Sequence, residues 1–132
     1  MAFSKQQRIE VHSKLNGRCA YCGVEIPIKD MQVDHIIPQR NFIQHIKNKW
    51  RIPPFLNHLS EFDLNHIDNL HPACRVCNNW KKDFDLELFR REISEQIKRL
   101  NSYSANYRFA KKYGLIHENL VPIRFFFENL SL

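Results

Sequence analysis

The sequence predicts a small domain of the α+β class that is held together by a zinc ion bound to cysteine. Apolar and polar residues alternate over 31–36, as in a short strand, and Pro38 ends this pattern. Apolar residues recur every three or four positions over 86–100, as in a helix packed on one face. All four cysteines occur in two Cys-x-x-Cys pairs. The 132 residues suffice for one domain of ordinary size, so 1–132 is expected to be a single domain.

Helix signals occur at both ends of the chain. Ser4 and Gln7 have the spacing of a capping box, which predicts a helix over about 5–16 that Gly17 ends. The apolar residues expected on its buried face are Ile9 and Leu15. Asp85 is the expected N-cap of the helix that ends near residue 100.

The remaining elements are predicted to be short. A short helix is expected around 42–46, and a helical turn at 55–59 follows the Pro-Pro pair. Another short helix is expected over 103–110, and Gly114 stops it. Alternation over 121–127 predicts a strand, which Pro122 restricts to a sheet edge.

Composition and charge restrict the function classes. Hydrophobic residues make up 43% and charged residues 26%, which are globular values, and no apolar run is long enough to span a bilayer. The N-terminal residues lack a secretory pattern, so a cytoplasmic location is expected. The formal net charge of +6 favours an anionic partner, most commonly nucleic acid. Candidate nucleic-acid contacts, with an ordinary solvated face as the alternative, are Arg40, Lys47, Lys49 and Arg51.

The cysteine pairs predict a structural zinc site. Two residues between thiolates allow both sulfurs of a tight turn to bind one metal ion, and two such turns give the tetrahedral four-sulfur set that zinc prefers. The pairs are Cys19 with Cys22 and Cys74 with Cys77. Because a four-sulfur set leaves no open position, this zinc would be structural. The alternatives are unrelated core thiols or a redox Cys-x-x-Cys.

Three further motifs lie between and beside the cysteine pairs. They read Asp34-His35-Ile36-Ile37-Pro38, Asp68-Asn69-Leu70 and Cys77-Asn78-Asn79-Trp80-Lys81. With the cysteine pairs, residues 19–81 resemble the HNH endonucleases, the zinc-knuckle branch of the ββα-metal (His-Me finger) nucleases. The chain departs from many members of that family by having Asn at position 78 in place of His, and by its long gap between the first two motifs. The resemblance implies a ββα-metal core with an insertion at about 40–66 and a C-terminal helical extension over 82–132.

The resemblance also implies roles for single residues. His35 would be the general base that deprotonates the attacking water, and Asp34 and Asn78 would bind a catalytic Mg²⁺, with Mn²⁺ as the alternative ion. Asn69 would hold its loop and His35 in orientation, and Lys81 would lie near the phosphate. A neutral imidazole, whose ordinary pKa is near 6.5, suits a base at neutral pH. The alternatives are a turn residue for Asn69, a helix N-cap for Asn78 and a solvated surface lysine for Lys81.

The resulting expectation is a Mg²⁺-dependent endonuclease that nicks DNA and leaves 3′-hydroxyl and 5′-phosphate ends. DNA is the expected partner, no membrane partner is expected, and a homodimer would be needed to cut both strands at once. Two alternatives stay open. One is a catalytically silent, zinc-dependent nucleic-acid-binding module, and the other is a ribonuclease or nuclease toxin with the same site.

Overall fold

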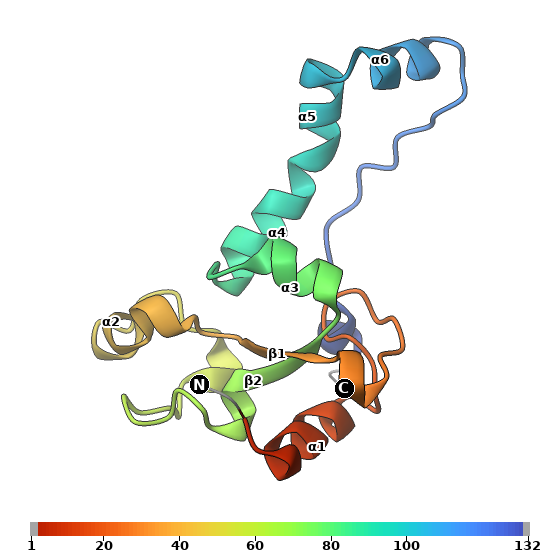
Figure 1. Cartoon of the computed structure of the whole chain (residues 1–132). Coiled ribbons are helices and arrows are strands. Elements are labelled where there is room, and N and C mark those ends of the chain that lie inside the picture. Colours follow the sequence, from red (N-terminus) through yellow and green to blue (C-terminus); the bar gives the residue numbers. More distant parts are fainter. Residues whose placement is uncertain (1–2, 131–132) are drawn as a thin grey trace.

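The computed structural model describes residues 3–130, which form helices and one small sheet (Figure 1). This confirms the α+β class. In chain order, the elements are α1 (Lys5–Lys14), β1 (Gln32–His35), α2 (Phe42–Lys47), β2 (Leu70–Ala73), α3 (Arg75–Lys81), α4 (Leu86–Ser94), α5 (Gln96–Tyr103) and α6 (Ala105–Lys112). Across the described range 3–130, no helix is both long and apolar enough to cross a membrane.

The two strands pair antiparallel and lie between helices. Asp34 is directly opposite His71, and His35 is opposite Leu70. In Figure 1, α1 lies below the strands and α3 and α4 lie above them, and α1 packs on β2 while α3 packs on β1. β1 agrees with the alternation over 31–36, whereas β2 was not predicted. Since all four residues of β2 are buried and one is proline, β2 shows no alternation that could reveal it.

Helix α1 begins and ends as its sequence predicts. The Ser4 hydroxyl accepts a hydrogen bond from the Gln7 backbone at 3.1 Å, and the Gln7 side chain accepts one from the Ser4 backbone at 2.8 Å. At the other end, Gly17 has a φ of +77° and donates to the His12 carbonyl at 2.9 Å, which closes a Schellman turn. The prediction for Ile9 was wrong, because it is 39% exposed while Val11 is fully buried. Residues two apart on a helix point in nearly opposite directions.

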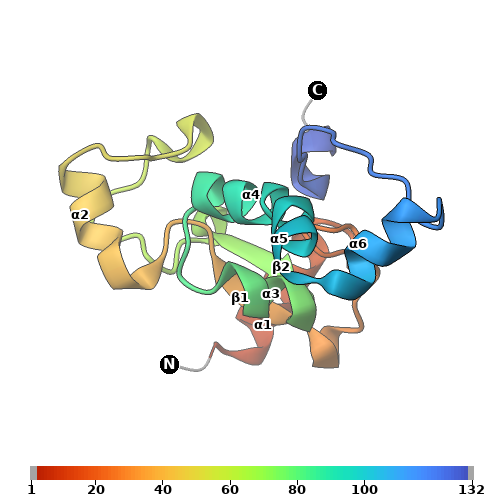
Figure 2. The same cartoon turned by 90° about the horizontal axis from the view of Figure 1, so that it is seen from above.

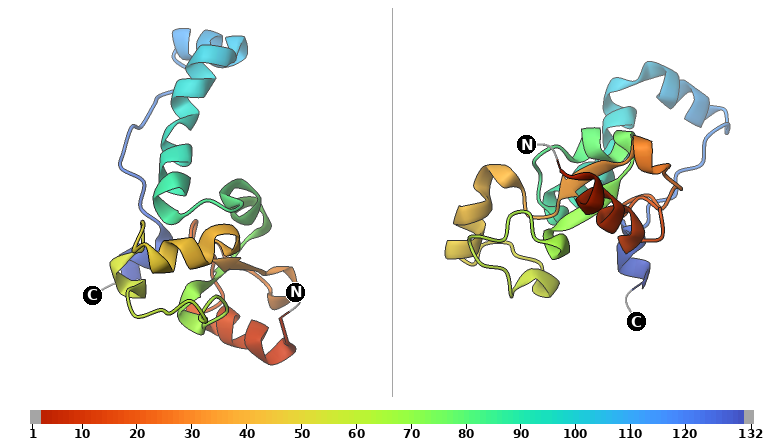
Figure 3. Two further views of the ribbon diagram at one scale, coloured as in Figure 1. Left: turned by 90° about the vertical axis from the view of Figure 1, so that its left-hand side faces the viewer. Right: turned by 60° about the horizontal axis from the view of Figure 1, so that its bottom comes forward.

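The C-terminal helices differ from the expected single helix and strand. The Asp85 carboxylate caps α4 by accepting from the Leu88 backbone at 2.9 Å, as predicted. The helix is interrupted at Glu95 and continues as α5. Helices α4, α5 and α6 rise away from the sheet, and residues 114–125 return as an extended segment (Figures 1 and 3).

The strand expected over 121–127 is absent from the described structure. Residues 115–125 have no regular structure, and Phe126–Leu130 form a 3₁₀ turn. The alternation has a different cause: Phe125 and Phe127 both pack edge-on against the ring of Tyr21. Pro122 also removes one backbone donor that a strand would need. The apolar residues of 121–127 therefore alternate because Phe125 and Phe127 pack against the first cysteine turn, and not because they form a strand.

Seen from above, α2 and the chain that follows it lie on one side of the sheet, and α6 lies on the opposite side (Figure 2). The apolar core around the sheet includes Met31, Ile36, Ile37, Leu56, Leu70 and Phe89. Six polar side chains are buried among the described residues, and four of them lie on or directly beside the sheet, namely Asp34, Asn69, His71 and Lys81. Burying polar groups is costly unless they are hydrogen bonded, so these four residues define the region where the fold supports a site.

Candidate metal centre and active site

The four cysteines come together as the sequence predicts. The sulfurs of Cys19, Cys22, Cys74 and Cys77 all lie within 4.8 Å of one another. The Cys22 and Cys74 sulfurs are 3.8 Å apart, which matches the ~3.8 Å edge of a tetrahedron built on zinc–sulfur bonds of about 2.3 Å. The cluster therefore suits a zinc-type ion, and its four sulfurs would fill the tetrahedral coordination of that ion.

The thiols already interact with one another. The pKa of Cys19 is lowered to about 4, chiefly by the hydrogen bond that it shares with the Cys77 thiol, and the pKa of Cys77 is raised by the same contact. Thiolate negative charge is therefore favoured at Cys19, on the buried side of the cluster. Zinc binds thiolates, so the four sulfurs would bind an ion in their deprotonated form.

The second cysteine pair begins helix α3. Cys74 is the N-cap, and its sulfur accepts a hydrogen bond from the Cys77 backbone at 3.4 Å. Counting from Cys74, the residues at i+3, i+4 and i+7 are Cys77, Asn78 and Lys81, which share one helix face. Asn78 and Lys81 therefore lie on the same face of α3 as the cysteines at its start.

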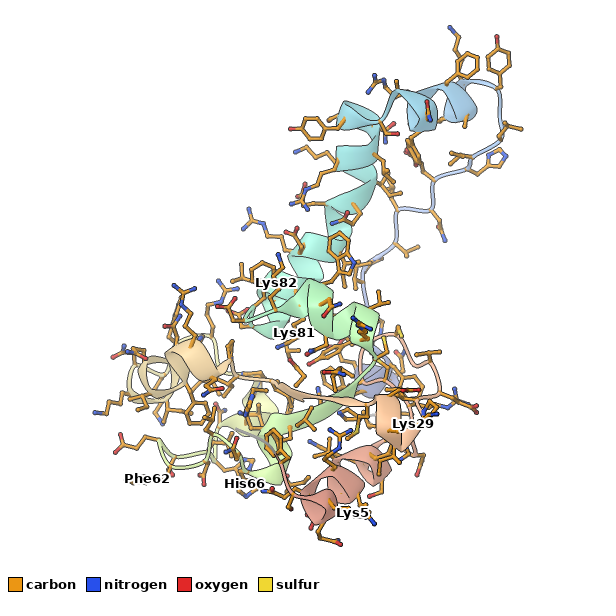
Figure 4. All side chains as sticks on the ribbon, in the orientation of Figure 1. Lys5, Lys29, Phe62, His66, Lys81 and Lys82 are labelled. Atoms are coloured by element: carbon orange, nitrogen blue, oxygen red, sulfur yellow. The ribbon has the colours of Figure 1, made fainter. Side chains whose placement is uncertain are left out.

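Lys81 is fully buried and binds β1. Its ammonium donates to one Asp34 carboxylate oxygen at 3.1 Å and to the His35 carbonyl at 2.9 Å. In Figure 4, Lys81 lies on α3 above the sheet, while the adjacent Lys82 lies at the outer end of that helix. The alternative of a solvated surface lysine was therefore wrong. The expected position of Lys81 near the phosphate stays a prediction.

Asp34 is held from two sides in a buried network. Its second carboxylate oxygen accepts a hydrogen bond from the Tyr21 hydroxyl, and that hydroxyl lies 3.3 Å from the His71 Nδ1 atom. Burial raises the pKa of Asp34, and the Lys81 ammonium opposes this shift. Burial also raises the pKa of Tyr21 and lowers that of His71, so the tyrosine stays protonated and the histidine stays neutral. Tyr21 belongs to the first cysteine turn, which links the metal cluster to Asp34.

His35 is half-buried and is oriented by a residue that the sequence did not indicate. Its Nε2 atom lies 2.8 Å from the Asn65 side-chain oxygen, which accepts a hydrogen bond from an Nε2–H tautomer. In that neutral tautomer, Nδ1 carries the free lone pair. Asn65 lies in the predicted insertion and has no motif around it, so only its spacing of four residues from Asn69 could have suggested it.

Asn69 braces the backbone that follows His35. Its side-chain oxygen accepts from the Ile37 backbone at 2.8 Å, and its amide nitrogen donates to the Leu64 carbonyl at 2.9 Å and the Ile37 carbonyl at 3.3 Å. Asn69 thus fixes the loop, while the direct hydrogen bond to His35 comes from Asn65. Asn69 itself is fully buried within a 3₁₀ turn, Ile67–Asn69.

One open cavity of about 470 Å³ brings together the predicted general base and the two predicted Mg²⁺ ligands, whereas Asn69 and Lys81 do not line it. Asp34, His35 and Asn78 line it, as do Arg40, Lys82 and Asp83. Asn78 is inside α3 and does not cap it, so the N-cap alternative was wrong. Residues that carry an imidazole, a carboxylate and an amide therefore line one cavity together with cationic residues, although the Asp34 side chain is only 4% exposed.

The four candidate basic residues make different contacts. Arg40 lines the cavity and lies 3.3 Å from Asp83, whereas Lys47 pairs with Glu61 at 3.7 Å. Arg51 binds the buried Asp85 carboxylate at 2.8 Å and so fastens the start of α4. Lys49 is exposed at the end of α2. Their contact with nucleic acid stays a prediction, and Arg40 has the best placement for it.

The fold and site thus define an α+β protein with a four-cysteine cluster that suits a metal ion and with a polar cavity. No family model and no curated protein matches the chain. Among solved structures, a crystal structure of the type II-C Cas9 enzyme from Actinomyces naeslundii is similar, with 21% identity and a TM-score of 0.45. The match covers 90% of this chain and 14% of that chain. A likeness this low does not assign a family or an activity.

Proposed function

We propose that this chain is a metal-dependent endonuclease of the HNH type that hydrolyses DNA phosphodiester bonds. The observation that carries the proposal is the shared cavity of Asp34, His35 and Asn78. The strands β1 and β2 followed by α3 would be its ββα-metal core. A protein that only bound nucleic acid would not need an imidazole beside two residues that carry hard oxygen ligands.

The donor set fits Mg²⁺. An ionised carboxylate offers about four acceptor positions, and Tyr21 and Lys81 occupy two of those on Asp34. The remaining positions and the Asn78 amide oxygen would hold the ion, which keeps most of its waters and accepts phosphate oxygens. When bound, Mg²⁺ would stabilise the charge that develops on the phosphate and on the leaving oxygen.

The proton transfer would belong to His35. Because Asn65 accepts from Nε2–H, the free Nδ1 lone pair would take a proton from a water molecule in the cavity. The water oxygen would bond to phosphorus as the bond from phosphorus to the 3′ oxygen breaks. That oxygen would leave as a 3′-hydroxyl after protonation, and the phosphate would stay on the 5′ end.

The buried residues would position this chemistry without touching the substrate. Lys81 neutralises Asp34 and holds the His35 carbonyl, so that the two adjacent residues of β1 keep different orientations. Asn69 fixes the backbone at Ile37, immediately after β1. Arg40 and Lys82 at the cavity rim would bind phosphate oxygens.

The test uses zinc-loaded protein with supercoiled plasmid and with single-stranded RNA, each with added Mg²⁺ and without it. We expect Mg²⁺-dependent nicking of the plasmid before linear DNA forms, because one site cuts one strand at a time. End labelling should then find 3′-hydroxyl and 5′-phosphate ends. Cleavage of RNA alone would indicate a ribonuclease, and binding without cleavage would indicate a silent binding module, so either result would contradict the proposal.

A further inference from the structure

A second group of potential metal ligands lies outside both the cysteine cluster and the cavity. Single ligand atoms of His58, His66 and Asp68 all lie within 4.8 Å of one another. None of the three residues lines the cavity of the candidate active site. We propose that they bind a first-row divalent transition-metal ion, with Zn²⁺ as the probe.

The spacing of the ligand atoms fits such an ion. The Asp68 Oδ2 atom lies 2.7 Å from His58 Nε2 and 3.8 Å from His66 Nδ1. Metal–ligand bonds of about 2.0–2.1 Å give a tetrahedral edge of about 3.3 Å, which lies between these two distances. Small side-chain rotations would therefore place all three atoms at bonding distance from one ion.

The chemistry of the ligands selects the class of metal. Two imidazoles with one carboxylate suit zinc, iron, nickel or copper better than magnesium or calcium, which prefer oxygen ligands. His66 Nδ1 accepts a hydrogen bond from the Asp68 backbone at 3.0 Å, so it is the unprotonated ring nitrogen, and an ion bound there would take the place of that backbone donor. The side chains of His58, His66 and Asp68 are 53%, 40% and 46% exposed, which leaves room for a water molecule as the fourth ligand.

The two parts of the site are anchored differently. The Lys14 ammonium donates to the carbonyls of Ile67 and Leu70 at 2.8 Å and 2.6 Å, so the segment that carries Asp68 is fixed to α1. His58 precedes a loop without regular helix or strand, on which Phe62 is 87% exposed. Figure 4 shows Phe62 and His66 on this loop, below the sheet. The ion would join His58, at the start of this loop, to the anchored segment that carries Asp68.

The same loop supports the proposed general base. Residues 59–65 lie between the ligands, and they include Leu64, whose carbonyl binds Asn69, and Asn65, whose amide binds His35. An ion at His58, His66 and Asp68 would close this loop and restrict Asn65. Metal binding itself does not depend on the proposed nuclease function, because the site uses no residue of that cavity.

The test measures zinc per chain after equilibrium dialysis of the whole protein. We expect wild type to hold one equivalent more than His58→Ala or His66→Ala, while His117→Ala, an exposed histidine elsewhere, matches wild type. Far-UV circular dichroism of each variant checks that it is folded. Equal zinc content in wild type and in both cluster variants would overturn the proposal, whether or not the protein cleaves DNA.

Discussion

Two regions of the molecule are stabilised by different contacts. They are the body, residues 3–83, and the arm, helices α4–α6. The body buries Asp34, Asn69, His71 and Lys81, and each has a hydrogen-bond partner inside the fold. In the arm, α5 and α6 have no buried residue, and Tyr103 at the end of α5 is 86% exposed. Tertiary contacts therefore specify the body, whereas local caps and pairs specify the outer arm.

The contacts of the outer arm are correspondingly local. The Ser104 hydroxyl caps α6 by accepting from the Tyr107 backbone at 3.1 Å. The Glu118 carboxylate accepts from Asn101 and Tyr107 and pairs with Lys111 at 3.1 Å. Such partly exposed contacts stabilise a structure weakly, so we expect substitutions in the arm to change the stability of the arm alone. Changes in the body should reach the candidate active site.

The largest effect is expected from loss of the cysteine cluster. Cys77→Ser removes one of four ligands, and structural zinc sites contribute about 10–16 kcal/mol in zinc-finger peptides. We expect loss of bound zinc and of the near-UV circular dichroism signal of the packed aromatic rings around Tyr21. Adding Zn²⁺ back should restore chelator-treated wild type but not the variant. A variant that unfolds cooperatively at the wild-type temperature would contradict a structural role for the cluster.

The next effect is expected from the buried ion pair. Lys81→Met leaves the Asp34 carboxylate buried without its charged partner, which typically costs about 3–5 kcal/mol of unfolding free energy. Urea denaturation measures this cost, with Lys82→Met as the control because Lys82 is exposed. The double variant Asp34→Asn with Lys81→Met should recover part of the stability, since no charge is then stranded. An equal decrease of unfolding free energy in the two lysine variants would show that the ion pair of Lys81 with Asp34 does not stabilise the fold.

A smaller, pH-dependent effect is expected from His71. Burial keeps its pKa well below the ordinary value of 6.5, so the unfolded chain binds a proton below pH 6.5 that the folded chain does not. The unfolding free energy that depends on a neutral His71 is fully present above pH 6.5. It decreases as the pH falls below 6.5, by at most about 1.4 kcal/mol per pH unit. His71→Phe removes the titrating group, so the unfolding free energy of this variant should change less with pH between pH 6.5 and 5. The control variant His117→Phe, at an exposed histidine, should show the wild-type pH dependence of unfolding free energy. The same wild-type pH dependence in His71→Phe would show that His71 does not cause it.

The smallest effect is expected in the arm. Tyr107→Phe removes the hydrogen bond of 2.9 Å to Glu118 and leaves the ring in place. We expect faster amide hydrogen exchange in α6 and unchanged exchange in β1 and β2, because no contact of Tyr107 reaches the sheet in the described residues. Faster exchange in the strands would show that the arm and the body are coupled.

The sequence revealed the features that depend on local pattern. The Ser4 capping box, the Asp85 cap and the pairing of the cysteines each follow from residues a few positions apart. The grouping of Asp34, His35 and Asn78 at one cavity agrees with the motif resemblance. Short spacing within each motif makes such features visible without knowledge of the fold.

Features that depend on distant contacts were missed. Tyr21 and Asp34 are 13 residues apart, and Asn65 and His35 are 30 apart, so no local periodicity connects them. β2 is buried on all its residues and lacks alternation, whereas 121–127 alternates because Phe125 and Phe127 pack on one ring. Lys81 shows the same limit, since only its tertiary partner Asp34 explains a fully buried lysine.

The central claim is that this cavity hydrolyses DNA with His35 as its base, and the initial rate of plasmid nicking in Mg²⁺ tests it most directly. Removing a general base typically lowers a rate by about 10²–10⁴-fold. We predict a decrease of that size for His35→Ala, with zinc content and unfolding free energy close to wild type because His35 is only half-buried. His117→Ala, purified in parallel, should nick at the wild-type rate. Nicking by His35→Ala at the wild-type rate would contradict the account.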